Sequence, residues 1–221
     1  MAVYLGSSSV TLTKVNVIER NGESIIDRTI SGYFTSDVDY IGYAAFCECS
    51  ALTSVSFPDC TSIESYAFRS CSALSQISFP VCTSIESYAF YSCFALSSVN
   101  FPVCTSIGSY AFHYCYALSQ ISFPACINIG SYAFRHCSSL TEASFPSCTS
   151  IGSYAFANCY NLISLNLTVV SSVPTLGTSV FYSTPIAGYQ KYGSVYVPTS
   201  LYSDFLIATN WSNISSRIVS V

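Results

Sequence analysis

The sequence predicts a β-rich solenoid, in which short coils of the chain stack on one another. One observation is the phrase "IGSYAFHYC" at residues 107–115, which returns as variants such as "IESYAFRSC" and "IGSYAFANC". A second is a constant step of 22 residues, kept by the isoleucines Ile41, Ile63, Ile85, Ile107, Ile129 and Ile151. A period of this length is typical of stacked repeats, so six coils are expected.

Each coil is expected to contain one short strand, which ends at a proline in the first five coils and at Thr168 in the sixth. In "LTSVSFPDCTSI" (residues 52–63), Val55 and Phe57 alternate with serines, which is the pattern of a strand with one buried face. Pro58 follows, and a proline ends the strand because it lacks the N–H group that a β-ladder needs. The outward strand positions carry mainly Ser, Gln and Asn, so the strand face should be polar and almost uncharged.

Residues 1–40 are expected to cap the first coil. The stretch "TLTKVNVIERNGESIIDRTI" (residues 11–30) predicts a β-hairpin that turns at Asn21-Gly22. The repeats would then occupy residues 41–170.

Residues 171–221 are expected to form a degenerate seventh coil and a C-terminal α/β cap. Here "LGTSVF" resembles "IGSYAF", and "VYVP" resembles "ISFP". Residues 199–211 predict one helix, capped by Thr199 or Ser200, with an apolar face that covers the last strand.

The repeated pattern "IGSYAF..C..L..I.FP" resembles the BspA-type leucine-rich repeat, over residues 41–168. The resemblance implies a right-handed leucine-rich-repeat solenoid of parallel strands. It also implies a bacterial cell-surface or secreted protein that binds host molecules or other cells. The expected partner is therefore a protein or glycan on a cell surface. Similar repeats occur in phage-associated proteins, which leaves a virion location as an alternative.

Composition argues against two classes of partner. Only 8% of the residues are charged and the net charge is −4, so binding to a nucleic-acid backbone is not expected. No apolar run reaches the roughly 18 residues of a membrane-spanning helix.

The first residues also lack a charged segment followed by an apolar one, so no secretory signal peptide is expected.

Eleven of the twelve cysteines fall into two columns that keep the 22-residue step, and only Cys47 lies outside them. A buried thiol packs as a small apolar group, so a structural role is expected. Zinc sites use paired short spacings such as C-x-x-C, which do not occur, and no metal or other cofactor is expected. Unpaired thiols fit a reducing compartment, which favours the cytoplasm or a virion as the alternative location.

No catalytic motif occurs in the sequence, and the protein is not expected to be an enzyme. A nucleophile pair of His136 with Cys115 or Cys137 can be drawn, but the column pattern places both cysteines inside the coils. The few carboxylates have no evident partner across a cleft.

The candidate binding residues lie in the turn around the repeated cysteine, where the coils differ most. Freely drifting exposed positions should fill with Lys, Glu, Ser and Thr, but these collect Tyr, Arg, His and Phe, which supply contact area in interfaces. We call this set the turn strip: Arg69, Tyr91, Phe94, His113, Tyr114, Tyr116, Arg135, His136, Asn158 and Tyr160. Two alternatives remain: the rings pack on neighbouring coils as a ladder, or the polar strand face binds the ligand.

Two functions follow from these observations. The first is a non-catalytic binding or adhesion module that recognises a protein or glycan through its rigid repeat surface. The alternative is a structural or virion-associated component whose caps dock other subunits.

Overall fold

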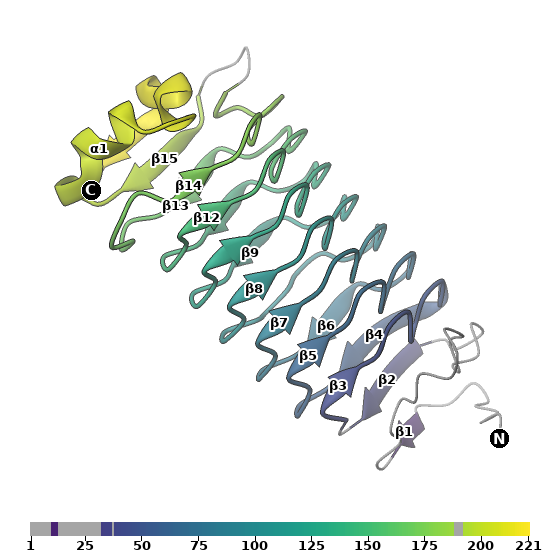
Figure 1. Cartoon of the computed structure of the whole chain (residues 1–221). Helices are drawn as coiled ribbons and strands as arrows, with labels where there is room; N and C mark the ends of the chain where they lie inside the picture. Colours follow the sequence, from purple (N-terminus) through teal and green to yellow (C-terminus); the bar gives the residue numbers. More distant parts are fainter. Residues whose placement is uncertain (1–9, 13–31, 37, 188–191) are drawn as a thin grey trace.

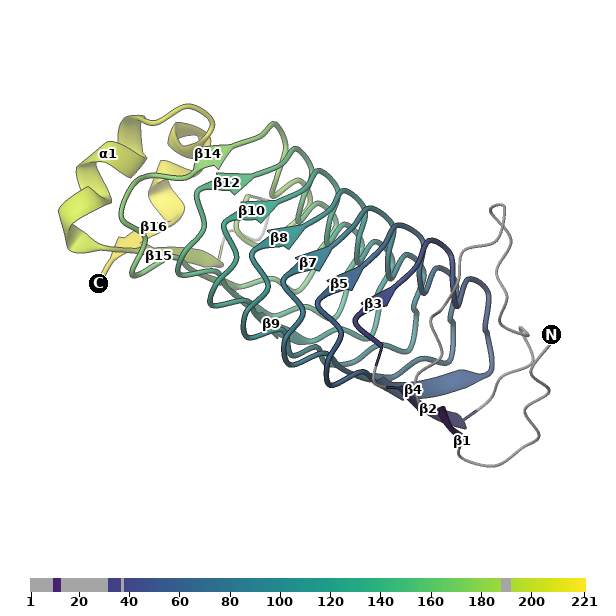
Figure 2. The same ribbon diagram turned by 60° about the horizontal axis from the view of Figure 1, so that its bottom comes forward.

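The coils stack into an elongated array in which every strand pair is parallel (Figure 1). The computed structural model describes residues 10–12, 32–36, 38–187 and 192–221. A seven-stranded sheet runs along one face of the array, as Figure 2 shows. Its strands are β3 (Tyr40–Ile41), β5 (Ser62–Ile63), β7 (Ser84–Ile85), β8 (Ser106–Ile107), β10 (Asn128–Ile129), β12 (Ser150–Ile151) and β14 (Thr175–Leu176).

Two further sheets together form a second column, which contains the strands that the sequence predicts before each proline. One sheet holds β1 (Val10–Leu12), β2 (Gly32–Ser36), β4 (Leu52–Ser56) and β6 (Gln76–Ser78). The other holds β9 (Gln120–Ser122), β11 (Glu142–Ser144), β13 (Ser164–Asn166), β15 (Ser194–Val197) and β16 (Ile218–Ser220). Between the two sheets, the strand expected at residues 98–100 is reduced to one parallel bridge, from Ser98 to Gln120.

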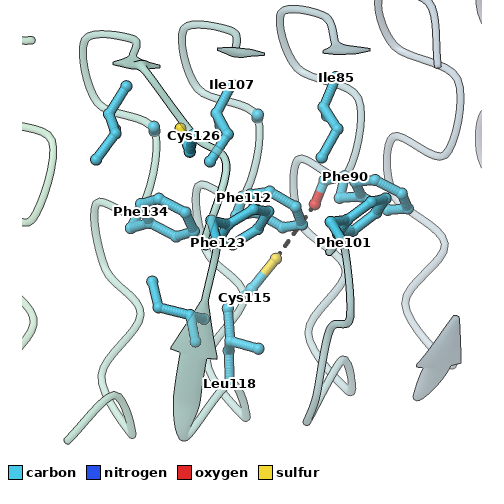
Figure 3. Packing of buried hydrophobic residues seen from close by; sticks show 14 of the residues in the cluster. Ile85, Phe90, Phe101, Ile107, Phe112, Cys115, Leu118, Phe123, Cys126 and Phe134 are labelled. Atoms are coloured by element: carbon cyan, nitrogen blue, oxygen red, sulfur yellow. Dashed lines mark hydrogen bonds between the residues drawn. The ribbon is translucent and has the colours of Figure 1, made fainter. Parts of the chain in front are cut away.

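Two columns of stacked phenylalanines fill the interior. In the first, Phe90, Phe112 and Phe134 stack with ring centroids 5.2 Å apart. In the second, Phe101 and Phe123 stack at 5.7 Å, and each ring also meets a ring of the first column (Figure 3). All of these rings are fully buried. Because each ring packs between identical rings of the neighbouring coils, the core is continuous along the array.

The cysteines complete this core as thiols. Each of the ten from Cys60 to Cys159 is buried and donates its S–H group to a backbone carbonyl. Cys115, for example, donates to the carbonyl oxygen of Phe90 in the preceding coil, at 3.3 Å (Figure 3). Cys126, in the other column, donates to the carbonyl of Asn128, two residues ahead, at 3.4 Å. The predicted structural role of the cysteine columns is confirmed for these ten residues.

The degenerate seventh coil is present, but at a wider step. Strand β14 pairs with β12 so that Thr175 lies opposite Ser150, and Phe181 stacks on Phe156 at 6.1 Å. Strand β15 pairs with β13, with Ser194 opposite Ser164. The seventh coil therefore continues the core, but it contains more residues than a regular coil.

The C-terminal cap differs from the single helix predicted for residues 199–211. The segment forms a 3-10 turn η1 (Thr199–Leu201) and a short helix α1 (Tyr202–Ile207), and a second 3-10 segment η2 (Trp211–Arg217) follows. Neither predicted residue caps a helix: the N-cap position of η1 is Pro198, and Thr199 donates its hydroxyl to the Val221 carbonyl instead. The helix ends because Ala208 is extended (ψ 148°). Apolar packing of the cap is confirmed, since Phe205, Trp211, Ile214 and Ile218 are buried.

At the other end, the hairpin predicted to turn at Asn21-Gly22 lies outside the described residues. What is described there is β1, which pairs in parallel with β2. Within the described ranges, no helix is long and apolar enough to cross a bilayer.

Candidate binding surface

The backbone of each turn is fixed by hydrogen bonds between coils. In the turn that contains the phrase "IGSYAFHYC", both Tyr110 (φ 60°) and Tyr114 (φ 64°) adopt the left-handed conformation, which is unfavourable for bulky side chains. The N–H groups of Tyr110, Phe112 and Tyr114 donate to carbonyls of the next coil at 2.8–3.1 Å. Stacking therefore holds a strained turn in place and presents its side chains at a constant spacing.

A ladder of tyrosines borders the turn strip. The rings of Tyr66, Tyr88, Tyr110, Tyr132 and Tyr154 stack in sequence with centroids 4.6–5.0 Å apart. All five are half-buried. This column keeps the 22-residue step, and its faces are occupied by its own members. The edges of these tyrosine rings therefore border the turn strip.

The turn strip divides by exposure. Arg69, Phe94, Tyr116 and Tyr160 are exposed, whereas Tyr91, Tyr114, Arg135 and His136 are half-buried. His113 and Asn158 are buried. Ring packing between coils, the first alternative, occurs among buried and exposed members alike, as in His113 with His136 and Phe94 with Tyr116. Eight of the ten residues nevertheless keep some accessible surface.

His113 lies at the centre of the packed part of the strip. Its ring contacts those of Tyr91, Tyr110, Tyr114 and His136, with centroids 4.1–5.6 Å away. It is only 3% exposed, and neither ring nitrogen has a hydrogen-bond partner among the described residues. Burial, and secondarily the charge of Arg135 and the nearby His136, lower the pKa of His113 to about 4. The imidazole is therefore neutral at pH 7.

The polar members of the strip are held by their neighbours. Asn158 Nδ2 lies 3.0 Å from Nε2 of His136. Burial, and then the charge of Arg135, lower the pKa of His136. The guanidinium of Arg135 sits over the Tyr132 ring at 5.6 Å, and that of Arg69 over Tyr66 at 5.9 Å. The strip and the tyrosine ladder thus form one connected surface.

A pair of exposed rings lies on the surface of the central coils. Phe94 and Tyr116 occupy the same position in consecutive coils and stack with centroids 5.4 Å apart. They are 43% and 42% exposed. Exposed aromatic rings on a fixed backbone are the type of group that anchors a partner.

A cavity of about 960 Å³ opens where the array meets the C-terminal cap. It combines three segments: Tyr160 from the sixth turn, residues 176–187 of the seventh coil, and Asn210, Asn213 and Ile214 of the cap. We call it the C-terminal groove. The sequence analysis singled out Tyr160 but not the other lining residues of this groove. The signal that could have indicated them is the departure of the seventh coil from the 22-residue step.

The described residues offer no metal site. No group of three or more His, Cys, Asp or Glu side chains among them is placed to hold an ion. Burial also raises the pKa of the thiols of Cys115 and Cys137 well above the usual value, which disfavours the thiolate. The exposed rings of this surface, such as Phe94 and Tyr116, are available for apolar contact.

Comparison with solved structures finds a similar fold in bacterial proteins. A leucine-rich repeat protein of T. pallidum is 26% identical, with a TM-score of 0.58, over 79% of this chain and 75% of that one. A leucine-rich repeat protein of Bacteroides ovatus is 19% identical, with a TM-score of 0.43, over 85% of this chain and 63% of that one. A leucine-rich cell surface protein of Faecalibacterium prausnitzii is 22% identical, with a TM-score of 0.46, over 84% and 61%.

No curated protein sequence matches the chain. A family model described as the BspA type leucine-rich repeat region, in six copies, matches residues 28–124 and 61–188. These matches cover the whole regular array and the turn of the seventh coil. The stacked parallel coils, the 22-residue register and this match agree, and the chain belongs to the BspA-type leucine-rich repeat family.

Proposed function

We propose that this chain is a non-catalytic binding or adhesion module that recognises a protein or glycan on a cell surface. The observation that carries the proposal is the stacked pair Phe94 and Tyr116, two exposed rings on turns whose backbone is already fixed. Family membership supports it, because leucine-rich repeat solenoids generally serve as binding scaffolds. A bacterial surface or secreted location is part of the same proposal.

Rigidity favours binding by such a surface. Ordering flexible loops and side chains costs free energy when a complex forms. Here the turn backbone is ordered by the coil-to-coil hydrogen bonds, and the rings of Phe94 and Tyr116 already restrain each other. A partner would therefore lose little of its contact energy to ordering.

The sparse charge of the chain predicts how binding should respond to salt. Only 8% of the residues are charged, so contact would rest on ring faces and neutral hydrogen bonds. Salt screens exposed charges over about 10 Å at 0.1 M but leaves apolar contact largely unchanged. Binding should therefore persist at moderate salt.

The test is binding of labelled, monomeric protein to whole bacterial cells, epithelial cells and mucin. The double variant Phe94→Ser with Tyr116→Ser should reduce saturable binding about tenfold or more. The matched control is Val81→Ser with Val103→Ser, a pair that also lies one coil apart and is 41% exposed at each position. The control should bind as the parent does, and both variants should melt within a few degrees of it. Equal binding by all three proteins would contradict the role of the ring pair, and no binding to any surface would contradict the adhesion function.

One observation favours a second candidate, a structural or virion-associated component. The ten cysteines from Cys60 to Cys159 are buried thiols, which suits folding in a reducing compartment. In that case the caps would dock other subunits. Mass spectrometry of purified phage particles from the producing cells would support this candidate if the chain co-purifies in fixed stoichiometry, and would reject it if the chain is absent.

A further inference from the structure

We infer that the C-terminal groove binds an uncharged oligosaccharide, built from hexose or N-acetylhexosamine units. The inference rests on the proposed binding function and names a site and a ligand class for it. Four features support it: the size of the groove, two exposed tyrosines, a set of neutral polar groups, and the absence of charge among its described lining residues.

The size and composition of the groove suit a small ligand. At about 960 Å³ it lies near the upper end of the range for ligand pockets. Its apolar floor includes Val180, Phe181 and Ile214, all buried. A ligand seated there would meet apolar side chains together with a few polar groups, which is the usual composition of such sites.

Tyr182 and Tyr160 provide the aromatic part of the groove. They are 61% and 54% exposed, so a large part of each side chain is accessible although both residues line the cavity. The C–H groups of a sugar ring form an apolar face that packs against an aromatic ring, while the phenol hydroxyl remains available for hydrogen bonding.

The polar groups of the groove match the hydroxyls of a sugar. The side chains of Ser179, Ser183 and Asn213 make no hydrogen bond within the described part of the chain and are left for a ligand. Hydroxyl and amide groups both donate and accept, as sugar hydroxyls and acetamido groups do. None of the described lining residues is charged, so an ionic ligand would find no counter-charge in them.

The groove is ordered by contacts that do not depend on a ligand. The carbonyl of Tyr182 accepts from the N–H of Asn158 at 2.8 Å, and its own N–H donates to the carbonyl of Ser179 at 3.1 Å. On the cap side, Asn210 Nδ2 donates to the carbonyl of Leu176 at 2.6 Å. The indole of Trp211 donates to Pro174 at 2.7 Å. Binding would therefore need little rearrangement.

The same contacts disfavour a peptide that adds a strand. Strand β14 is the last strand of its sheet, and an added strand would need its free backbone groups. The Leu176 carbonyl already accepts from the Asn210 side chain, so the cap occupies this acceptor of β14. A saccharide does not need this edge.

The experiment is a titration of the full chain with hexamers of N-acetylglucosamine, glucose and mannose, with a galacturonate hexamer as the charged probe. Calorimetry gives the affinity. Fluorescence reports on the groove through Phe181, because Trp211 is the only tryptophan and its buried ring lies 6.2 Å from that of Phe181 in the lining. Tyr182→Ala and Tyr160→Ala should each weaken binding of the best neutral hexamer about tenfold. Tyr40→Ala, which removes a 47% exposed ring in strand β3 outside the groove, is the matched control and should stay within about twofold.

Saturable binding of one neutral hexamer, with a shift in Trp211 emission and loss in both groove variants but not in the control, would support the inference. Unchanged binding in correctly folded Tyr182→Ala would overturn it, as would equal or tighter binding of the galacturonate probe. If no neutral hexamer binds but the parent still binds cells, the groove inference fails and the adhesion function stands. If neither cells nor hexamers are bound, both fail.

Discussion

The regular coils and the seventh coil are variants of one phrase, yet they offer different surfaces. Between β5 and β12 the strands pair at an unchanging step, as in Ile63 opposite Ile85, and the interior is filled by stacked rings. At β14 the step widens, so that Leu176 lies opposite Ile151, and a groove opens beside the cap. A constant register closes the core completely, whereas extra residues leave a space at its end. The regular coils therefore contribute most of the buried core, and the seventh coil contributes the groove.

The sharpest test of this difference is deletion of one core ring in each region. Phe112→Ala should lower the free energy of unfolding by about 3–5 kcal/mol, because the ring is fully buried between two identical rings. Phe181→Ala should cost about half as much, since Phe181 lines the groove and water can enter the vacated space. Denaturant unfolding of both variants measures the contrast. Equal losses would mean that the seventh coil is packed as tightly as the others.

Acid should destabilise the regular array through His113. Its pKa of about 4 in the fold is below the ordinary 6.5, so protonation favours the unfolded chain. The contribution is fully present above pH 6.5 and is lost as the pH falls toward 4, to a limit of about 3 kcal/mol. Unfolding measured between pH 7 and 4 should show this slope, and His113→Phe, which keeps a ring but cannot titrate, should flatten it. A slope that persists unchanged in the variant would assign the acid sensitivity to other groups.

Close approach between coils should make one glycine column sensitive to a single methyl group. A Cβ at Gly130 would lie 2.5 Å from the Ser109 nitrogen and 2.6 Å from the Gly108 carbonyl carbon. Gly130→Ala should therefore cost about 1–3 kcal/mol. The same column carries Glu64 and Glu86 in earlier coils. An Ala variant as stable as the parent would show that the later coils can move far enough apart to accept a Cβ, as the earlier coils with Glu64 and Glu86 do.

The smallest expected effect is that of reductant. The thiols from Cys60 to Cys159 are buried and hydrogen-bonded to carbonyls, and burial raises the pKa of Cys104 to about 11. Their thiolate forms are therefore disfavoured, and the melting temperature should be the same with and without dithiothreitol. Thiol titration should detect at least ten more groups in denaturant than in buffer. A melting temperature that falls on reduction would reveal a disulfide and contradict the packing role.

Periodicity made the array predictable from the sequence. Residues such as Phe112 and Cys115 recur at one step because every coil solves the same packing problem, so their burial could be inferred without coordinates. The turn strip was visible as the place where coils differ. Which of its members face solvent depends on the left-handed residues of the turn, and these place His113 inside and Tyr116 outside.

The C-terminal cap and the groove depend on tertiary contacts that no local pattern shows. The helix predicted for residues 199–211 stops early, and the chain then turns through Asn210 in the left-handed conformation. That turn delivers the Asn210 amide and the Trp211 indole to carbonyls of Leu176 and Pro174. The groove combines segments distant in sequence, so only the broken period indicated its place.

Because the regular coils keep a 22-residue step, the length of the array is proportional to the number of coils. If one coil were duplicated or lost in frame, every remaining coil would still pack against neighbours of the same kind. The array could therefore change length without needing a new interface between coils. Each such event would move the C-terminal groove by about 4.8 Å along the axis. The number of coils thus sets how far the C-terminal groove lies from the N-terminal end, whereas the shape of the groove depends on the seventh coil and the cap.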